Sequence, residues 1–354
     1  MLRVSRRLTR AVDGRLTCTS GGPRAFSLDA ATLREHAQAC ALDLPTYVDP
    51  QTGFAVITER MHRKRGSCCG NACRHCPFGH INVADAAMQS QRITSPCLLR
   101  SKNSRRVQLE RKRRAKSQTS AGVPNRDVLF WSGGKDSWLA LDALMQSEHK
   151  AKEGHEPNPS IEPVLLTTFD ASSGDIPHQG FGYREVIDQA SQLGLDLLLV
   201  PIAPRSSNEA YVSAVGAALA APDLVGIDGS AMRVRRLVFG DLHLEEVRRW
   251  REEQFGKLGT NGLGYACYWP LFGVPQETLL QRLWLGVEQG RVDGIRVTSV
   301  PSAAAVRDCI QEGDMYDAEA VERLQQLPPD GISCDPMGEG GEFQTKVLLQ
   351  SPII

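Results

Sequence analysis

A glycine-rich segment in the middle of the chain has the composition of a phosphate-binding loop. It comprises Ser132, Gly133, Gly134, Lys135, Asp136 and Ser137, and it lies between an apolar run at 128–131 and a helical pattern at 138–146. Two adjacent glycines allow a sharp turn, so consecutive backbone N–H groups can face one anion. The start of the following helix adds partial positive charge. The segment therefore predicts a phosphate site, and an ordinary glycine-rich turn is the alternative.

The side chains of this loop suit a nucleotide that carries a metal ion. Ser132 and Ser137 offer hydroxyl donors, and Lys135 can neutralise phosphate charge. Asp136 is placed to help hold a magnesium ion. A Walker loop needs a longer spacing before its Gly-Lys pair, so this is another kind of phosphate cradle. We expect Lys135 and Asp136 to lie at the surface, at the mouth of a sheet.

Carboxylates elsewhere in the chain could join this chemistry. Asp241 follows Gly240 at a predicted strand end, where active sites of parallel sheets gather. It could position ammonia or magnesium, or it could cap the next helix. Glu339 and Glu342 lie in a glycine-rich segment at 338–342, where a flexible backbone lets both approach one cation or amine. A solvated acidic turn is the alternative there.

A cluster of cysteines near the N-terminus forms a second group of candidate ligands. Cys68, Cys69, Cys73 and Cys76 lie within nine residues. Cys73 and Cys76 have the spacing of a two-ligand zinc knuckle, and Cys69 extends it to a three-cysteine spacing used by iron–sulfur clusters. We predict a metal site that holds either Zn²⁺ or an iron–sulfur cluster. A reduced, redox-sensitive loop is the alternative.

The elements that must position these residues alternate between strands and helices. Apolar runs of strand length occur at 128–131, 163–169, 195–200, 236–240 and 294–300. Helical patterns lie between them, and the one that contains Leu279, Leu283 and Val287 is followed by Gly290 as a terminal cap. Such alternation predicts an α/β fold with a doubly wound parallel sheet covered on both faces.

Charge divides the 354-residue chain into a basic front and an acidic back. Residues 1–117 carry 22 basic and 8 acidic side chains, whereas the remainder carries 19 and 33. Residues 1–27 are rich in arginine and hydroxyl residues, which is typical of an organelle transit peptide, with a disordered tail as the alternative. A transit peptide would place the protein in a mitochondrion or plastid, and otherwise it would be cytoplasmic.

Four further segments follow from these patterns. Residues 28–98 form a small Cys-rich module with a helix at 28–42 and a hairpin at 47–58, where Asp49, Pro50 and Gly53 supply turn chemistry. Residues 99–125 form a basic linker that could contact RNA. Residues 126–260 form a nucleotide-binding domain, and residues 261–354 a smaller C-terminal α/β substrate subdomain. No apolar run approaches the ~18 residues of a membrane-spanning helix, so no membrane role is expected.

The loop at 132–137 resembles the SGGxDS loop of the adenine nucleotide alpha-hydrolase superfamily, the N-type ATP pyrophosphatases. The resemblance implies a Rossmann-like sheet of the HUP type with ATP over the strand ends. It also implies that the loop grips pyrophosphate while ATP adenylates a carbonyl oxygen of the substrate. Ammonia or a sulfur donor then displaces AMP.

Three downstream segments, at 239–253, 268–272 and 334–345, resemble the diphthine–ammonia ligase branch, so the likeness covers about residues 126–354. It implies an ATP-dependent amide ligase acting on a small-molecule or protein-borne carboxylate with ammonia, with catalytic roles for Lys135, Asp136, Asp241, Glu339 and Glu342. It also implies ATP contacts by the loop and Gly240, and substrate contacts by His178, Arg184 and Gln344. For Arg184, an exposed arginine on a helix with no contact to substrate is an equally supported alternative. Position 344 is Gln where many relatives have His, and the segment from His178 to Arg184 is closer to the short, mainly bacterial relatives.

Two other functions are compatible with the sequence. A tRNA sulfur transferase would use the cysteine cluster and the basic linker, although Cys267, Cys309 and Cys334 are the only candidates for a persulfide in the second half. A metal-dependent adaptor that only senses ATP is the other. Residues 47–78 resemble a small uncharacterised domain with no assigned activity. The oligomeric state does not follow from these patterns.

Overall fold

The computed structural model describes residues 30–84, 93, 95–101, 125–151, 162–220, 233–258, 264–301, 304–327 and 334–349. The predicted transit peptide or tail at 1–27 lies outside these ranges, as does nearly all of the predicted linker at 99–125. The described residues form two compact units. The small unit comprises 30–62 and 68–84, and the larger unit comprises 63–67 and everything described from 93 onward. Within the described ranges, no helix combines the length and apolarity that a membrane crossing requires.

The small unit contains the predicted helix and hairpin. Helix α1 (Ala30–Ala41) is followed by strands β1 (Thr46–Val48) and β2 (Ala55–Ile57), which pair antiparallel with Tyr47 opposite Val56. Gly53 has φ 71°, and its N–H donates to the carbonyl of Asp49 at 2.8 Å. These observations confirm the hairpin and its turn chemistry. Helix α2 (Glu59–Arg65) follows, and the cysteine segment begins just after it.

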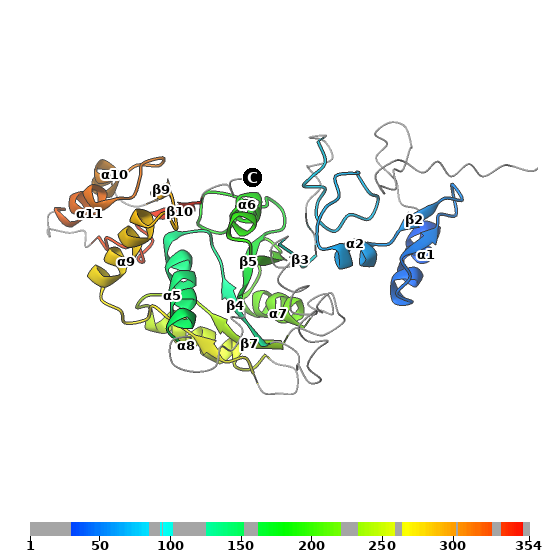
Figure 1. Cartoon of the computed structure of the whole chain (residues 1–354), viewed down its shortest axis with the longest axis horizontal. Coiled ribbons are helices and arrows are strands. Elements are labelled where there is room, and N and C mark those ends of the chain that lie inside the picture. Colours follow the sequence, from blue (N-terminus) through cyan, green and yellow to red (C-terminus); the bar gives the residue numbers. More distant parts are fainter. Residues whose placement is uncertain are drawn as a thin grey trace, which may run out of the picture. The chain divides into compact units, whose positions relative to one another are not determined.

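The larger unit is an α/β fold built on a six-stranded, mostly parallel sheet (Figure 1). Its strands lie in the order β3-β6-β5-β4-β7-β8. Their bounds are β3 (Cys97–Leu99), β4 (Asn125–Phe130), β5 (Val164–Asp170), β6 (Asp196–Ile202), β7 (Arg233–Val238) and β8 (Cys267–Tyr268). All neighbours pair parallel except the edge strand β3, which pairs antiparallel with β6. The predicted parallel sheet is therefore present, with one added antiparallel edge.

Helices cover both faces of this sheet. They are α5 (Lys135–Ala151), α6 (Tyr183–Leu193), α7 (Asn208–Leu219) and α8 (Glu245–Phe255). Val215 of α7 and Phe255 of α8 share one apolar core with the strand residues Val128 and Leu237. Because parallel crossovers are right-handed and the strand order reverses at β4, α5 and α6 cover the opposite face. The sheet is therefore buried on both sides, and this explains its continuous apolar strands.

The C-terminal part of the larger unit adds a second, two-stranded sheet beside α5 (Figure 1). This C-terminal part consists of α9 (Gln276–Glu288), β9 (Gly294–Ser299), α10 (Ala304–Cys309), α11 (Ala318–Gln325) and β10 (Gln344–Leu348). Strands β9 and β10 pair antiparallel with Val347 opposite Ile295. Gly290 has φ 64°, which confirms its predicted place after the end of α9. A Cβ on Gly286 would lie 2.1 Å from the Trp138 ring, so α9 packs directly against α5.

Candidate functional site

The glycine-rich loop at 132–137 lies at the point where the strand order reverses. It connects β4 to α5, and β4 lies between β5 and β7 in the sheet. The chain leaves β4 towards one edge of the sheet and later returns to build the other edge. In open α/β sheets, ligands bind in the crevice outside the strand ends at such a point. The loops after β4 and β7 are therefore the natural location of a site.

Gly240 brings these two loops into contact. A Cβ at this position would lie 2.9 Å from the carbonyl oxygen of Asp136 and 3.2 Å from the amide nitrogen of Ser137. Only glycine leaves room for so close an approach. The structure therefore unites the predicted phosphate loop with the segment that contains Asp241.

Inside the loop, Gly133 adopts φ 84°, a left-handed conformation that favours glycine. The Gly134 N–H donates to Ser132 Oγ at 3.3 Å, and the Lys135 N–H donates to Thr345 Oγ1 at 3.3 Å. The Ser137 hydroxyl donates to the Gly134 carbonyl at 2.9 Å. The hydrogen bonds from the Gly134 and Lys135 N–H groups are long, so both donors are only weakly bound to their hydroxyl acceptors.

Lys135 is buried, contrary to the expected surface position. The residue is 3% exposed, because strand β10 and the segment before it cover the loop. Its Nζ lies 5.7 Å from the centre of the Phe343 ring and contacts the Asp136 carboxylate at 2.9 and 3.0 Å. The sequence did not show this cover, because β10 comes more than 200 residues later. The ion pair therefore joins the buried ammonium of Lys135 to the partly exposed carboxylate of Asp136, whose side chain is 36% accessible.

Negative charge is concentrated around the loop. Desolvation raises the pKa of Asp136, and the carboxylates of Asp335 and Asp241 raise it further, while Lys135 opposes the shift. Desolvation also raises the pKa of Glu339, against hydrogen bonds from two backbone N–H groups, and Asp136 contributes in the same direction as desolvation. A cation bound among these carboxylates would relieve their repulsion. The residues present therefore fit a divalent ion beside the glycine-rich loop at 132–137.

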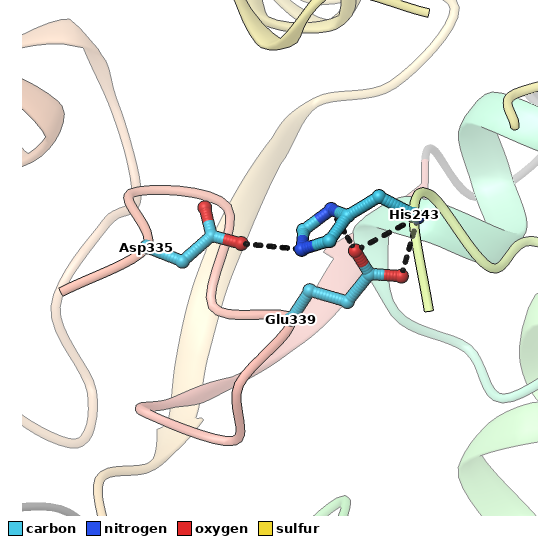
Figure 2. A group of neighbouring side chains, drawn as sticks. All are labelled: His243, Asp335 and Glu339. Carbon is cyan, nitrogen blue, oxygen red and sulfur yellow. Dashed lines mark hydrogen bonds and ion pairs between the residues drawn. The ribbon is translucent and has the colours of Figure 1, made fainter. Parts of the chain in front are cut away.

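Glu339 joins the C-terminal segment to the loop after β7. Its carboxylate accepts hydrogen bonds from the Leu242 N–H at 2.6 Å and from the His243 N–H at 3.1 and 3.2 Å. It also forms an ion pair with Nδ1 of His243 (Figure 2). The side chain of Glu339 is 10% exposed, so it is not part of a solvated turn. His243 was not predicted as a site residue, although it lies two positions after Asp241.

Asp335 also belongs to this group and was not predicted. Its Oδ1 accepts hydrogen bonds from the Gln276 side chain at 2.6 Å and from the Met337 N–H at 2.8 Å. Glu342 Oε1 accepts from the Asp335 N–H at 3.0 Å. Glu342 thus fixes the backbone of the segment that carries Asp335, which is a structural contact in addition to its predicted catalytic role.

Asp241 does not cap the following helix. Helix α8 has Leu244 as its N-cap, without a side-chain capping bond. The Asp241 carboxylate instead accepts from Arg251 at 3.1 Å and from Trp269 Nε1 at 3.0 Å. The alternative of a simple cap is therefore wrong, and the carboxylate is held beside the loop by two donors.

The predicted substrate residues are only partly brought together. Gln344 Oε1 accepts from Gln179 Nε2 at 3.2 Å, and Gln179 Oε1 lies 3.3 Å from where a Cβ on Gly134 would be. Gln344 therefore lies close to the phosphate loop. His178 is exposed and has φ 66°, and Arg184 is exposed on α6 beside the Tyr183 ring.

A pocket of about 550 Å³ opens beside His243 and Asp335. It is lined by Leu242, His243, Gly273, Val274, Gln276, Leu279, Cys334, Asp335, Pro336 and Met337.

The cysteines Cys334 and Cys267 of the larger unit are not activated thiols. Burial raises the pKa of each to about 11. Both thiols are therefore protonated at neutral pH and are poor nucleophiles.

The four predicted cysteine ligands lie in the small unit as two close pairs. The Sγ atoms of Cys69 and Cys73 are 3.3 Å apart, and those of Cys68 and Cys76 are 3.8 Å apart. Neither separation is that of a disulfide, which is about 2.05 Å. Two thiolates on one tetrahedral zinc ion, with bonds of about 2.3 Å, lie about 3.8 Å apart.

The charge state of these thiols suits a soft metal. The hydrogen bond between the two sulfurs lowers the pKa of Cys68 to about 5 and raises that of Cys76. Among the described residues, however, the ligand atoms that converge as a set of three belong to His243, Asp335 and Glu339. The cysteines fit zinc in type and in one pair distance, and all four could hold it only if the two pairs moved together. Such an ion would crosslink the loop at 68–76.

Comparison with known protein families identifies one segment of this chain. A family of unknown function, DUF5522, matches residues 35–82. The match runs from within α1 to six residues beyond Cys76. It covers most of the described part of the small unit and assigns no activity to it.

Proposed function

We propose that the larger unit is an ATP-dependent amide ligase of the N-type ATP pyrophosphatase kind, with a HUP-type fold and a likeness to diphthine–ammonia ligases. One observation carries the proposal: at the reversal point of the sheet, a glycine-rich loop meets the loop after β7 and a carboxylate-bearing C-terminal segment. This arrangement offers anion donors and cation ligands side by side, as Mg²⁺-ATP requires.

ATP would bind with its phosphates against the loop at 132–137. The N–H groups of Gly134 and Lys135 would exchange their long bonds to hydroxyl oxygens for charge-assisted bonds to phosphate oxygens, which are shorter and stronger. Lys135 would neutralise phosphate charge from its buried position. Asp136 would help to hold Mg²⁺, which supplies charge neutralisation on the pyrophosphate.

The reaction would proceed in two steps. A carboxylate oxygen of the substrate attacks the α-phosphorus, and the bond from that phosphorus to the pyrophosphate oxygen breaks. The resulting acyl-adenylate is then attacked at its acyl carbon by ammonia, and the carbon–oxygen bond to AMP breaks. The nitrogen loses a proton, for which Asp241 is a candidate base, and an amide remains. Positioning and charge stabilisation are enough for such chemistry.

The test is to incubate the full chain with ATP, labelled ammonium and a cell extract, and to search for a labelled amide together with AMP and pyrophosphate. Lys135→Met should abolish AMP formation, whereas Lys257→Met, at an exposed position, should not. Formation of ADP instead of AMP would contradict the proposal. A labelled thio-nucleoside would instead indicate sulfur transfer, which the protonated states of Cys267 and Cys334 disfavour.

A further inference from the structure

His243, Asp335 and Glu339 have the composition and spacing of a metal centre (Figure 2). One ligand atom from each lies within 4.8 Å of the others. His243 Nε2 is 3.9 Å from Asp335 Oδ2, which is too long for a hydrogen bond. It is nevertheless shorter than two metal–ligand bonds of about 2.1 Å laid end to end, so one ion could touch both atoms.

The protein holds both carboxylates in place and leaves one oxygen of Asp335 facing the imidazole. Asp335 Oδ1 is occupied by Gln276 and Met337, while Oδ2 is buried and lacks a hydrogen-bond partner among the described residues. Glu339 Oε1 accepts from the Leu242 N–H, and its Oε2 accepts from the His243 N–H and contacts His243 Nδ1. A buried carboxylate oxygen without a donor is costly, and a bound cation would remove that cost.

We propose that these three residues bind one divalent first-row transition-metal ion, distinct from the Mg²⁺ of the nucleotide. An imidazole ligand favours such an ion over Mg²⁺, which prefers oxygen ligands and retains its water. With three protein ligands, the ion keeps at least one open position. His243 and Asp335 also line the 550 Å³ pocket, so the open position faces a space where a substrate oxygen could bind.

This site would stand apart from the ATP chemistry, and it can be tested without nucleotide. Mn²⁺ is the suitable probe, because carboxylates bind it well and thiolates prefer softer metals. The full chain is stripped with a chelator and titrated with Mn²⁺ in excess Mg²⁺, and free Mn²⁺ is followed by electron paramagnetic resonance. We expect one bound equivalent. Cys73→Ser with Cys76→Ser should retain it.

Variants locate the ion. His243→Gln and Asp335→Asn should each weaken Mn²⁺ binding by at least about tenfold, since even outer-shell changes cost that much. The His243 side chain is 62% exposed, so its replacement should leave the fold intact, which urea unfolding verifies. Asp293→Asn, an exposed carboxylate elsewhere in the same unit, should bind Mn²⁺ as the natural chain does.

Two results would overturn the proposal. One is failure of the natural chain to retain Mn²⁺ in excess Mg²⁺. The other is Mn²⁺ binding by both variants that is as tight as binding by the natural chain. Neither result bears on AMP formation, so the ligase proposal is judged separately.

Discussion

The backbone of Val347 is hydrogen-bonded to the backbone of Gly133, with its N–H 2.9 Å from the glycine carbonyl. The Gln189 side chain strengthens this junction, because its Nε2 donates to the carbonyls of both Gly133 and Val347, at 3.0 and 2.9 Å. Its Oε1 accepts from Trp131 Nε1 at 3.1 Å. The buried side-chain amide of Gln189 therefore joins α6, the glycine-rich loop and β10.

Replacing Gln189 with Leu should destabilise the larger unit. The change leaves the Trp131 N–H and two carbonyls with fewer partners in a site where Gln189 is 4% exposed. We expect a loss of about 1–3 kcal/mol in the free energy of unfolding, measured in urea. Gln281→Leu, at an exposed position on α9, is the control and should change stability by less than about 0.5 kcal/mol. Equal stability of the two variants would show that the junction is unimportant.

Gly240→Ala should impair catalysis by pushing two loops apart. The new Cβ would meet the backbone of Asp136 and Ser137, which cannot yield as a flexible side chain can. A displacement of that size should reduce AMP formation by about 100-fold. Gly313→Ala provides the comparison, because it adds a methyl at a positive-φ position with nothing within 4 Å and lies outside the candidate site. If both variants form AMP equally well, the contact at Gly240 does not control the loop.

Lys135→Met should reduce AMP formation by at least about 100-fold, since it removes a buried cation from the proposed phosphate site. The same change should raise the pKa of Asp136 further, because Lys135 is the group that opposes desolvation there. Nuclear magnetic resonance titration of the Asp136 carboxyl measures this shift. A fall in that pKa would mean that Lys135 does not contact the carboxylate in solution.

Asp136→Asn should make stability less dependent on pH. The pKa of Asp136 is raised above 3.8 in the folded chain, so the folded state binds the proton more tightly than the unfolded state. Its contribution to stability is therefore greatest below the unfolded pKa and is lost as the pH rises through the folded pKa. The free energy of unfolding of the Asn variant, minus that of the natural chain, should therefore be larger at neutral pH than at a pH near 3.8. Urea unfolding of the variant and the natural chain at the two pH values checks this.

Cys73→Ser combined with Cys76→Ser should remove metal from the small unit. Cys76 contacts Cys68, and Cys73 contacts Cys69, so the double change breaks both thiol pairs. Metal analysis of the anaerobically purified full chain should show stoichiometric zinc or iron that the double variant lacks. The absence of metal from the natural chain would leave a redox-sensitive loop as the explanation. Cys309→Ser, outside this segment, is the matched control.

The long central strands could be predicted from sequence, and the short ones could not. Strands β4, β5 and β6 are buried on both faces, so each contains a run of at least three consecutive apolar residues. Strands β3 and β8 have only three and two residues and exist because a neighbour offers unpaired backbone groups. Two of the three residues of β3, Cys97 and Leu98, lie within the range 28–98 that was predicted as the Cys-rich module. Such pairings depend on tertiary structure rather than on local pattern.

The residues of the candidate site also include some that could be predicted from the sequence and some that could not. The position of residues 132–137 between a strand and a helix could be predicted, because the motif is continuous in the sequence and follows an apolar run. The grouping of His243 with Asp335 could not, because the two residues are 92 positions apart and meet only when the C-terminal segment folds against the loop after β7. Their signals were present locally: His243 follows the Gly-Asp pair closely, and Asp335 belongs to the segment that resembles a ligase motif.

The junction between Gly133 and β10 also has a consequence for biosynthesis. During translation, the strands of the central sheet leave the ribosome long before residues 343–347 do. Until those residues emerge, Lys135 lacks the Phe343 and Thr345 side chains that cover it, and the Gly133 carbonyl lacks its partner from Val347. A nascent chain would therefore display the glycine loop uncovered, and the proposed nucleotide site would be complete only after this last strand has been added.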